Sequence, residues 1–403
     1  MRLTLCCFLS VAFSSSECAA SQTATLPGTD NLSFRPRDPL NLVAFDHFYN
    51  LDYDRAVQEF DQVLKRHPDD AFAINHLLTA ILFHELYRMG VLNTGEYAND
   101  SFIKAAHRPA NPQAQTQIKD LVKRALTIEQ NRLAANPNDV EALYTRGVTR
   151  AEFATYTALV EHAWFSALHN AVGARHDHER VLELAPGDTE AKLLVGTHNY
   201  VVGSLPWALR SAGAMAGLGG NKAKGIQLLR ECAGGNGETA VDARILLALF
   251  LRREHRSDEA LPIVRQLIAA YPRNMLMALE EGNLLRAGGH AQEAGAVYVK
   301  VWHAGTEGGY PGQHYEIAAL TLGDLLRSGK DYVGAAAAYE QAVSVPQPDP
   351  DIAQKANLGA GEMYDLQKKR DLAMTKYKLV VAADSSTTSA DAARKYLKEP
   401  YNE

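Results

Sequence analysis

The chain has 403 residues, of which 46% are hydrophobic and 22% are charged, and its formal net charge is −6 at pH 7. This composition predicts a folded protein, and the mild negative charge argues against a nucleic-acid-binding protein, which usually carries a basic face. The length allows two or three ordinary domains or one elongated array.

The first twenty residues have the pattern of a signal peptide. Arg2 precedes an apolar run over residues 3–13, and small residues at Cys18 and Ala20 suit a cleavage site after Ala20. We therefore expect an exported protein of the periplasm or cell envelope, and the run is too short to span a membrane. Three of the four cysteines lie in this leader, which leaves Cys232 as a small buried hydrophobe. Residues 21–36 are rich in Thr, Ser, Asn, Pro and Gly and predict a disordered lead-in.

A constant spacing of small and apolar residues begins after this lead-in. Ala56, Phe60, Val63 and Pro68 are separated by 4, 3 and 5 residues. Residues three and four apart share one helical face, so this set predicts a helix that buries a small Ala and ends at the Pro. The same spacing returns in a later set, Ala260, Val264, Leu267 and Pro272.

Between these sets the register continues, but the hairpins grow. An Ala precedes a helix-ending Pro by 12 residues at four places, Ala56, Ala125, Ala174 and Ala260. Gly147 and Ala174 are 27 residues apart, and the extra length predicts about two more turns in each helix of that hairpin. Residues 89–112, rich in Gly, Asn and Pro, predict a long loop inside the second hairpin.

The C-terminal part repeats a fuller pattern, in which a Gly is followed 12 residues later by an Ala and four residues after that by a Tyr. The three sets are Gly282, Ala294 and Tyr298; Gly323, Ala335 and Tyr339; and Gly361, Ala373 and Tyr377. This pattern resembles the tetratricopeptide repeat, a 34-residue helix-turn-helix unit, and Ala260 and Ala294 are 34 residues apart.

The resemblance implies an all-α fold, a right-handed α-solenoid of about eight helix-turn-helix hairpins with enlarged hairpins in the N-terminal half. We place enlarged hairpins over 37–237, regular units over 241–387, and a capping helix with a tail over 388–403. The hairpins are predicted at 37–70, 71–138, 139–187, 188–237, 241–274, 275–308, 316–349 and 354–387.

No catalytic set or metal site is predicted, and no cofactor is expected. His162, His169 and His176 recur every seven residues, about 10 Å apart along a helix, too far for a shared metal. Residues 217–224 lack the glycine-lysine-hydroxyl order of a phosphate-binding loop, so we interpret them as a turn between helices.

The function expected from this resemblance is that of a non-enzymatic scaffold, which binds a protein or peptide partner in the concave groove lined by first helices. Alignment of the units places eight residues near that groove: Tyr144, Thr197, Tyr200, Arg252, Asn283, Arg286, Asp324 and Arg327. Two alternatives stay open. One is an enzyme with a site within residues 71–237, and the other is a peripheral envelope or membrane-associated assembly factor that uses the nearly uncharged stretch 193–220.

Overall fold

The computed structural model describes residues 34–92, 108–205 and 219–403, and within these ranges it contains 17 α-helices and no strand. None of these helices is long and apolar enough to cross a membrane. The predicted all-α solenoid is confirmed. The expected signal peptide, residues 93–107 of the expected loop and residues 206–218 of the uncharged stretch lie outside the described ranges.

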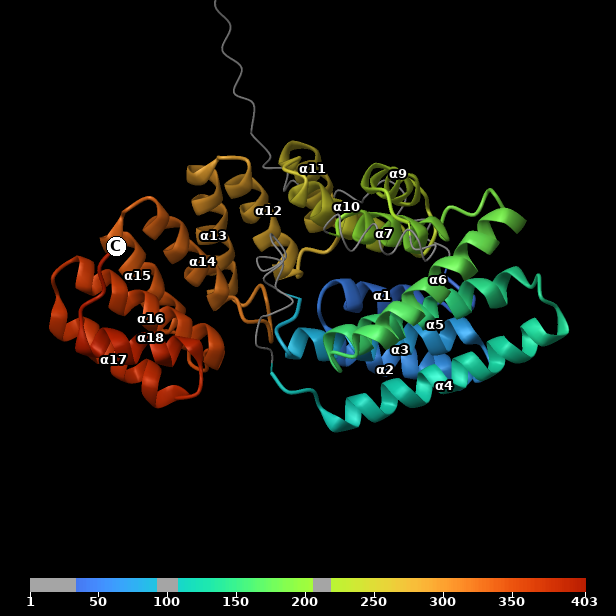
Figure 1. Ribbon diagram of the computed structural model, residues 1–403, viewed down its shortest axis with the longest axis horizontal. Helices are drawn as coiled ribbons and strands as arrows, with labels where there is room; N and C mark the ends of the chain where they lie inside the picture. The colour runs from blue at the N-terminus through green and yellow to red at the C-terminus, as the bar shows by residue number, and fades with distance from the viewer. Residues whose placement is uncertain (1–33, 93–107, 206–218) are drawn as a thin grey trace, which may run out of the picture.

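The helices pair as consecutive antiparallel hairpins (Figure 1). The N-terminal pairs are α1 (Leu40–Tyr49) with α2 (Tyr53–Arg66), α3 (Ala71–Arg88) with α4 (Pro112–Ala135), α5 (Val140–Leu159) with α6 (Trp164–Leu184), and α7 (Lys192–Gly203) with α9 (Lys222–Ala233). The C-terminal pairs are α10 (Ala240–Arg253) with α11 (Ser257–Ala270), α12 (Met275–Ala287) with α13 (Ala291–Thr306), α14 (Glu316–Ser328) with α15 (Tyr332–Ala342), and α16 (Pro350–Leu366) with α17 (Arg370–Ala383). The last helix, α18 (Thr388–Lys398), packs on α17 and covers the end of the array.

Short polar side chains start many of the helices. Asp70, Asp139, Asn274 and Asp349 each accept a hydrogen bond from a backbone N–H of the first turn that follows. These donors have no partner inside the helix, so a side-chain acceptor there stabilises the helix start by about 1 kcal/mol.

The repeat residues form the contact between the two helices of each regular hairpin. Ala335 and Tyr339 of α15 are buried, and the Tyr339 ring lies where a side chain at Gly323 of α14 would have to be. Tyr298 and Tyr377 lie in the same way against Gly282 and Gly361. The Gly, Ala and Tyr pattern is therefore a packing pattern, in which a glycine makes room for an aromatic ring.

The enlarged hairpins differ from the regular ones in helix length. α4, α5 and α6 have 24, 20 and 21 residues, whereas α12 and α13 have 13 and 16. In α6 the position four residues after Ala174 is His178, which is buried and lies against Gly147 as the tyrosines do in the later units.

The array curves so that the first helices are inside. First helices of neighbouring hairpins contact each other: α3 with α5, α5 with α7, α7 with α10, and α14 with α16. Among the described helices, the second helices of neighbouring hairpins make fewer contacts with each other. First helices that approach one another on one side place that side on the concave face of a solenoid.

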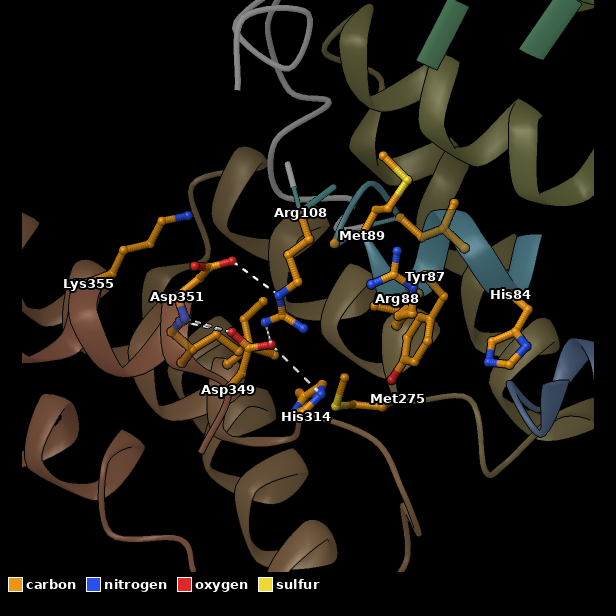
Figure 2. Close-up of a pocket in the computed structure, with 15 residues that line it drawn as sticks. His84, Tyr87, Arg88, Met89, Arg108, Met275, His314, Asp349, Asp351 and Lys355 are labelled. Carbon is orange, nitrogen blue, oxygen red and sulfur yellow. Dashed lines mark hydrogen bonds and ion pairs between the residues drawn. The ribbon is translucent and has the colours of Figure 1, made fainter. Parts of the chain in front are cut away.

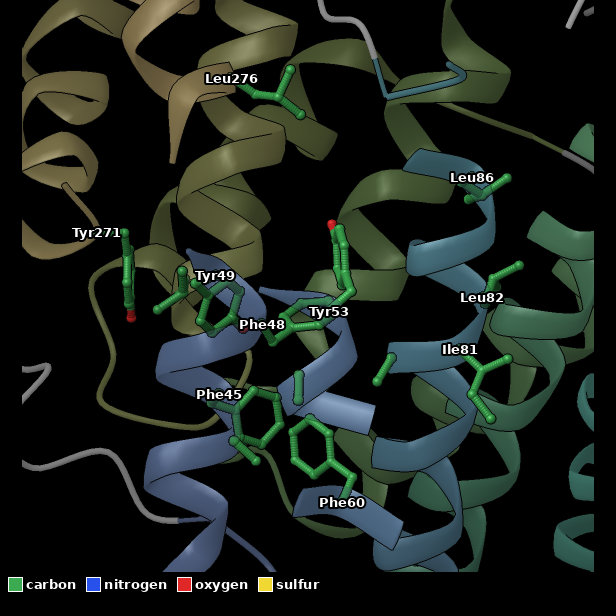
Figure 3. Packing of buried hydrophobic residues seen from close by; sticks show 14 of the residues in the cluster. Phe45, Phe48, Tyr49, Tyr53, Phe60, Ile81, Leu82, Leu86, Tyr271 and Leu276 are labelled. Atoms are coloured by element: carbon green, nitrogen blue, oxygen red, sulfur yellow. The ribbon is translucent and has the colours of Figure 1, made fainter. Parts of the chain in front are cut away.

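The first hairpin contacts helices far along the array, through Tyr49 and Asn50 at the end of α1. Phe45, Phe48 and Tyr49 of α1 share a hydrophobic core with α3 and with Tyr271 and Leu276, more than two hundred residues later (Figure 3). Residues 34–36, the end of the expected disordered lead-in, also pack on the array, because the Phe34 ring stacks on Phe45 at 4.3 Å.

Candidate functional site

Half of the residues predicted to line the groove are buried. The Tyr200 ring stacks on Phe250 at 3.8 Å, and its hydroxyl donates to Glu254. Arg252 forms a buried ion pair with Glu280, with 2.6 Å between Nη1 and Oε2. Asn283 accepts a hydrogen bond from the Tyr298 hydroxyl, and Tyr144 donates one to Glu190. These four side chains make contacts within the protein, so they present almost no surface to a partner.

The other four predicted residues reach solvent to different degrees. Thr197 of α7 is half-buried and donates to the carbonyl oxygen of Leu193 in its own helix. Arg286 at the end of α12 and Asp324 of α14 are exposed, and Arg327 of α14 is half-buried. Arg286, Asp324 and Arg327 therefore lie on the accessible part of the first-helix surface, in the sixth and seventh hairpins.

The N-terminal half of the concave face is occupied by α1 and the residues before it. The Tyr49 hydroxyl donates to Asp242 of α10 at 3.1 Å, and the Arg35 side chain donates to Glu190 at 2.8 Å. His76 of α3 is buried with its Nε2 atom 3.7 Å from Glu238. A partner peptide cannot lie on this part of the face unless the segment 34–49 is displaced.

Four carboxyl groups in this half have raised pKa values. Burial raises the pKa of Glu152 and Asp242 to about 7, despite hydrogen bonds from Thr79 and Tyr49. Burial also raises the pKa of Glu129 and Glu190 to about 7, and neighbouring Glu238 adds to the effect on Glu190. Each of the four accepts a hydrogen bond from a Thr or Tyr hydroxyl of the fold.

Two acidic residues of α16 were not among the groove residues predicted from the sequence. Arg327 forms an ion pair with Glu362 of α16, with 2.6 Å between Nη1 and Oε2, and Asp365 lies one turn further along α16. Glu362 and Asp365 lie one and four residues after the repeat glycine Gly361. Asp324 and Arg327 lie at the same two positions after Gly323. The same alignment extended by one unit finds both.

The segment after α18 lies on these residues. Arg327 donates to the Tyr401 hydroxyl at 2.8 Å, and its guanidinium carbon is 5.3 Å from the centre of the Tyr401 ring. The backbone N–H of Tyr401 donates to Asp365 at 2.8 Å, and Tyr332 of α15 donates to Glu403 at 2.9 Å. The tail therefore makes side-chain and main-chain contacts with the first-helix surface of the last two hairpins.

A cavity of about 250 Å³ lies where the N-terminal hairpins meet the C-terminal ones (Figure 2). Its walls come from the end of α3, from Met275 and His314, and from the start of α16. Arg108 forms ion pairs across it with Asp349 and Asp351, and Glu316 raises the pKa of His314 by accepting its hydrogen bond. Charges of both signs line this cavity. The ion pairs of Arg108 with Asp349 and Asp351 join residues that are far apart in the sequence.

The remaining sequence candidates carry no visible chemistry. His162, His169 and His176 are all exposed, and Cys232 is buried with its pKa raised to about 12. Within residues 34–92, 108–205 and 219–403, no group of three or more His, Cys, Asp or Glu side chains has a geometry that could hold a metal ion.

One stretch of the repeat array matches a known protein family. Residues 245–301 match the family model described as Tetratricopeptide repeat. No curated protein matches the chain.

The solved structures that resemble this chain come from different organisms. Pseudomonas aeruginosa pilF is 12% identical with a TM-score of 0.36, over 62% of this chain and 97% of that one. A tetratricopeptide repeat protein from Parabacteroides merdae is 16% identical with a TM-score of 0.34, over 79% and 97%. The human IFIT1 dimer with m7Gppp-AAAA is 13% identical with a TM-score of 0.40, over 89% and 82%.

Proposed function

Since this chain is a tetratricopeptide-repeat protein, we propose that it is a non-enzymatic scaffold that binds an extended segment of a protein partner across the first helices of its last three regular hairpins. Proteins of this repeat type generally act as scaffolds, with the concave face as the binding surface. Here the accessible part of that face comprises the end of α12 at Arg286 together with α14 and α16, because α1 covers the N-terminal part and packs on the start of α12.

The observation that carries the proposal is the position of the tail. No helix continues after Lys398, and Glu399 has extended backbone angles, φ −131° and ψ 126°. This non-helical segment is bound through one main-chain N–H to Asp365, one aromatic ring on Arg327 and one carboxylate on Tyr332. A surface that binds an extended segment of its own chain has the donors and acceptors needed to bind one from a partner.

The charges of this surface suit a partner segment with both polar and aromatic groups. Arg286 and Arg327 supply planar donors for carboxylates and faces for aromatic rings. Asp324 accepts from the Tyr339 hydroxyl, and the buried Asp365 accepts the backbone N–H of Tyr401. Arg and Tyr are frequent anchors in protein interfaces, so loss of the two arginines should weaken binding more than loss of any exposed Lys.

The test is site-specific photo-crosslinking in a cell-envelope extract. A crosslinking residue at position 286 should capture a defined partner, whereas the same residue at position 300, exposed on second helix α13, should not. In a pull-down, Arg286→Ala with Arg327→Ala should reduce partner recovery about tenfold while Lys300→Ala leaves it unchanged, with folding checked by circular dichroism. Equal recovery by all three proteins would remove the groove from the proposal.

We also propose that the protein acts in the periplasm or cell envelope. The support is the pattern of Arg2, the apolar run 3–13 and the small residues at 18 and 20. Osmotic-shock fractionation with N-terminal sequencing tests it, and a mature chain that begins at Ser21 is the expected result. Retention of residues 1–20 in a cytosolic fraction would contradict it.

A further inference from the structure

We propose that Phe72, Tyr144, Glu190 and Glu238 form an arginine-recognition pocket, which Arg35 of the same chain occupies and which takes the side chain of an arginine-bearing extended segment of a partner. This site lies in the N-terminal half of the concave face, apart from the groove of α12, α14 and α16. It does not depend on the function proposed for that groove.

The walls of the pocket come from separate parts of the repeat array. Phe72 is in the first turn of α3 and Tyr144 in the first turns of α5, whereas Glu190 and Glu238 lie just before α7 and α10. The two rings are 5.8 Å apart and nearly parallel, and Tyr144 holds Glu190 through its hydroxyl. Gly237 leaves room for the Glu190 side chain, since a Cβ there would collide with it. The walls therefore also contact one another, through the Tyr144 ring and hydroxyl.

The occupant enters from outside the repeats and makes contacts specific to arginine. The Arg35 guanidinium carbon lies 4.2 Å from the centre of the Phe72 ring and 4.8 Å from that of Tyr144. Its Nη2 atom is 2.8 Å from a Glu190 oxygen and 3.8 Å from a Glu238 oxygen. A planar cation that stacks on rings while it donates in its own plane satisfies both kinds of wall, and an ammonium group cannot do so.

The pocket also recognises the backbone of the segment that carries the arginine. The backbone N–H of Arg35 donates to Glu238 at 3.3 Å. An arginine within a peptide therefore fits better than free guanidinium.

Without a cation the pocket would hold two acids close together. Burial and the neighbouring Glu238 raise the pKa of Glu190 to about 7, and the positive charge of Arg35 acts against this rise. Two carboxyl groups within 4 Å of the same guanidinium nitrogen favour a cation between them, because it compensates for the water that they have lost.

One side of the Arg35 side chain is open to solvent. The Arg35 side chain is 31% exposed, and a cavity of about 410 Å³ lined by Arg35, Pro36 and Phe72 lies beside it. A segment from another chain can reach the pocket by this route once Arg35 has left.

The test uses the full chain with Arg35→Ala and the blocked pentapeptide Phe-Arg-Pro-Ala-Asp, which copies residues 34–38 with the second arginine removed. By isothermal titration calorimetry, the peptide should bind Arg35→Ala at least tenfold more tightly than it binds the wild-type chain. The matching peptide with Lys in place of Arg should bind at least tenfold more weakly. Glu190→Gln added to Arg35→Ala should abolish binding, and Arg327→Ala added instead should leave it unchanged.

A folded Arg35→Ala protein that does not bind the peptide, or binds it equally well with Glu190→Gln, would overturn the proposal. If Arg35→Ala does not fold, Arg35→Lys keeps a positive charge in the pocket, and the arginine peptide should then bind that variant more tightly than the wild-type chain. Equal affinity for Arg35→Lys and the wild-type chain would equally overturn it.

Discussion

The side-chain amide of Asn274 donates a hydrogen bond of 2.7 Å to the backbone carbonyl of Tyr49, which lies 225 residues earlier in the chain. Beside it, the backbone N–H of Arg273 donates to Asn50, and Gln313 donates to the carbonyl oxygens of Asn50 and Arg273. This buried polar cluster joins the turn of the first hairpin to the starts of the sixth and seventh. It explains why the accessible concave surface is confined to the C-terminal half.

Replacement of Asn50 by Ala should destabilise the protein by about 1–3 kcal/mol. Asn50 is 1% exposed, and its loss leaves the backbone N–H of Arg273 without its acceptor. Urea unfolding followed by circular dichroism measures the effect. Gln292→Ala, at an exposed position of α13, is the matched control and should change stability by less than about 0.5 kcal/mol. Equal stability of the two variants would mean that the contact between Asn50 and Arg273 contributes nothing measurable to the free energy of unfolding.

Replacement of Ala335 by Leu should cost about 1–3 kcal/mol through overpacking. Ala335 is fully buried between α14 and α16, whereas Ala337, two residues along the same helix, is exposed. Ala337→Leu should therefore unfold at nearly the wild-type urea concentration. Tolerance of Leu at both positions would contradict the packing described for α15.

Stability should fall as the pH rises from 5 to 7, and Asp242→Asn should reduce that fall. Burial raises the pKa of Asp242 from an unfolded value of about 3.9 to about 7, so the folded state binds a proton that the unfolded state has released. The stabilisation from this proton is complete below pH 4 and is lost as the pH passes through 7. The difference between wild-type and variant should be on the order of 2 kcal/mol across this range, measured by urea unfolding at each pH. Parallel pH profiles for the two proteins would contradict the assignment.

Removal of the Tyr401 side chain should increase partner capture by the C-terminal groove. Tyr401→Ala frees the Arg327 guanidinium from the ring and the hydroxyl that hold it. Tyr401→Phe keeps the ring and loses only the hydrogen bond, so its partner recovery should lie between those of Tyr401→Ala and the wild-type chain. The crosslinking yield from position 286 measures both, and unchanged yields would show that the tail does not compete with the partner.

The repeat architecture could be predicted because its signal is local. The distance from Gly323 to Ala335 and on to Tyr339 reports the packing of two adjacent helices, which depends on a few neighbouring side chains. The enlarged hairpins keep this register with other residues in the place of Tyr. His178 and Glu129, each four residues after an Ala, are buried there, and a search for aromatic residues alone passes over them.

The accessible surface could be predicted only in part, because it depends on how far the array curves. The same alignment selected Tyr144 and Arg327, but Tyr144 meets Arg35 from a segment expected to be disordered, whereas Arg327 stays reachable. Repeat spacing describes one hairpin and its neighbour. It contains no information on which distant hairpins meet once the superhelix completes a turn.

The contact between the first hairpin and the sixth and seventh also has a kinetic consequence. In an open array of repeats, terminal units can unfold one by one, and folding can begin anywhere because every contact is local. Contacts such as Tyr49 with Asn274 form only after a loop of 225 residues has closed, so they should develop late, slow the final folding step and suppress fraying of the first hairpin. This chain should therefore unfold in one cooperative transition from α1 to α14, in which the amide protons of the first hairpin exchange as slowly as those in the middle of the array.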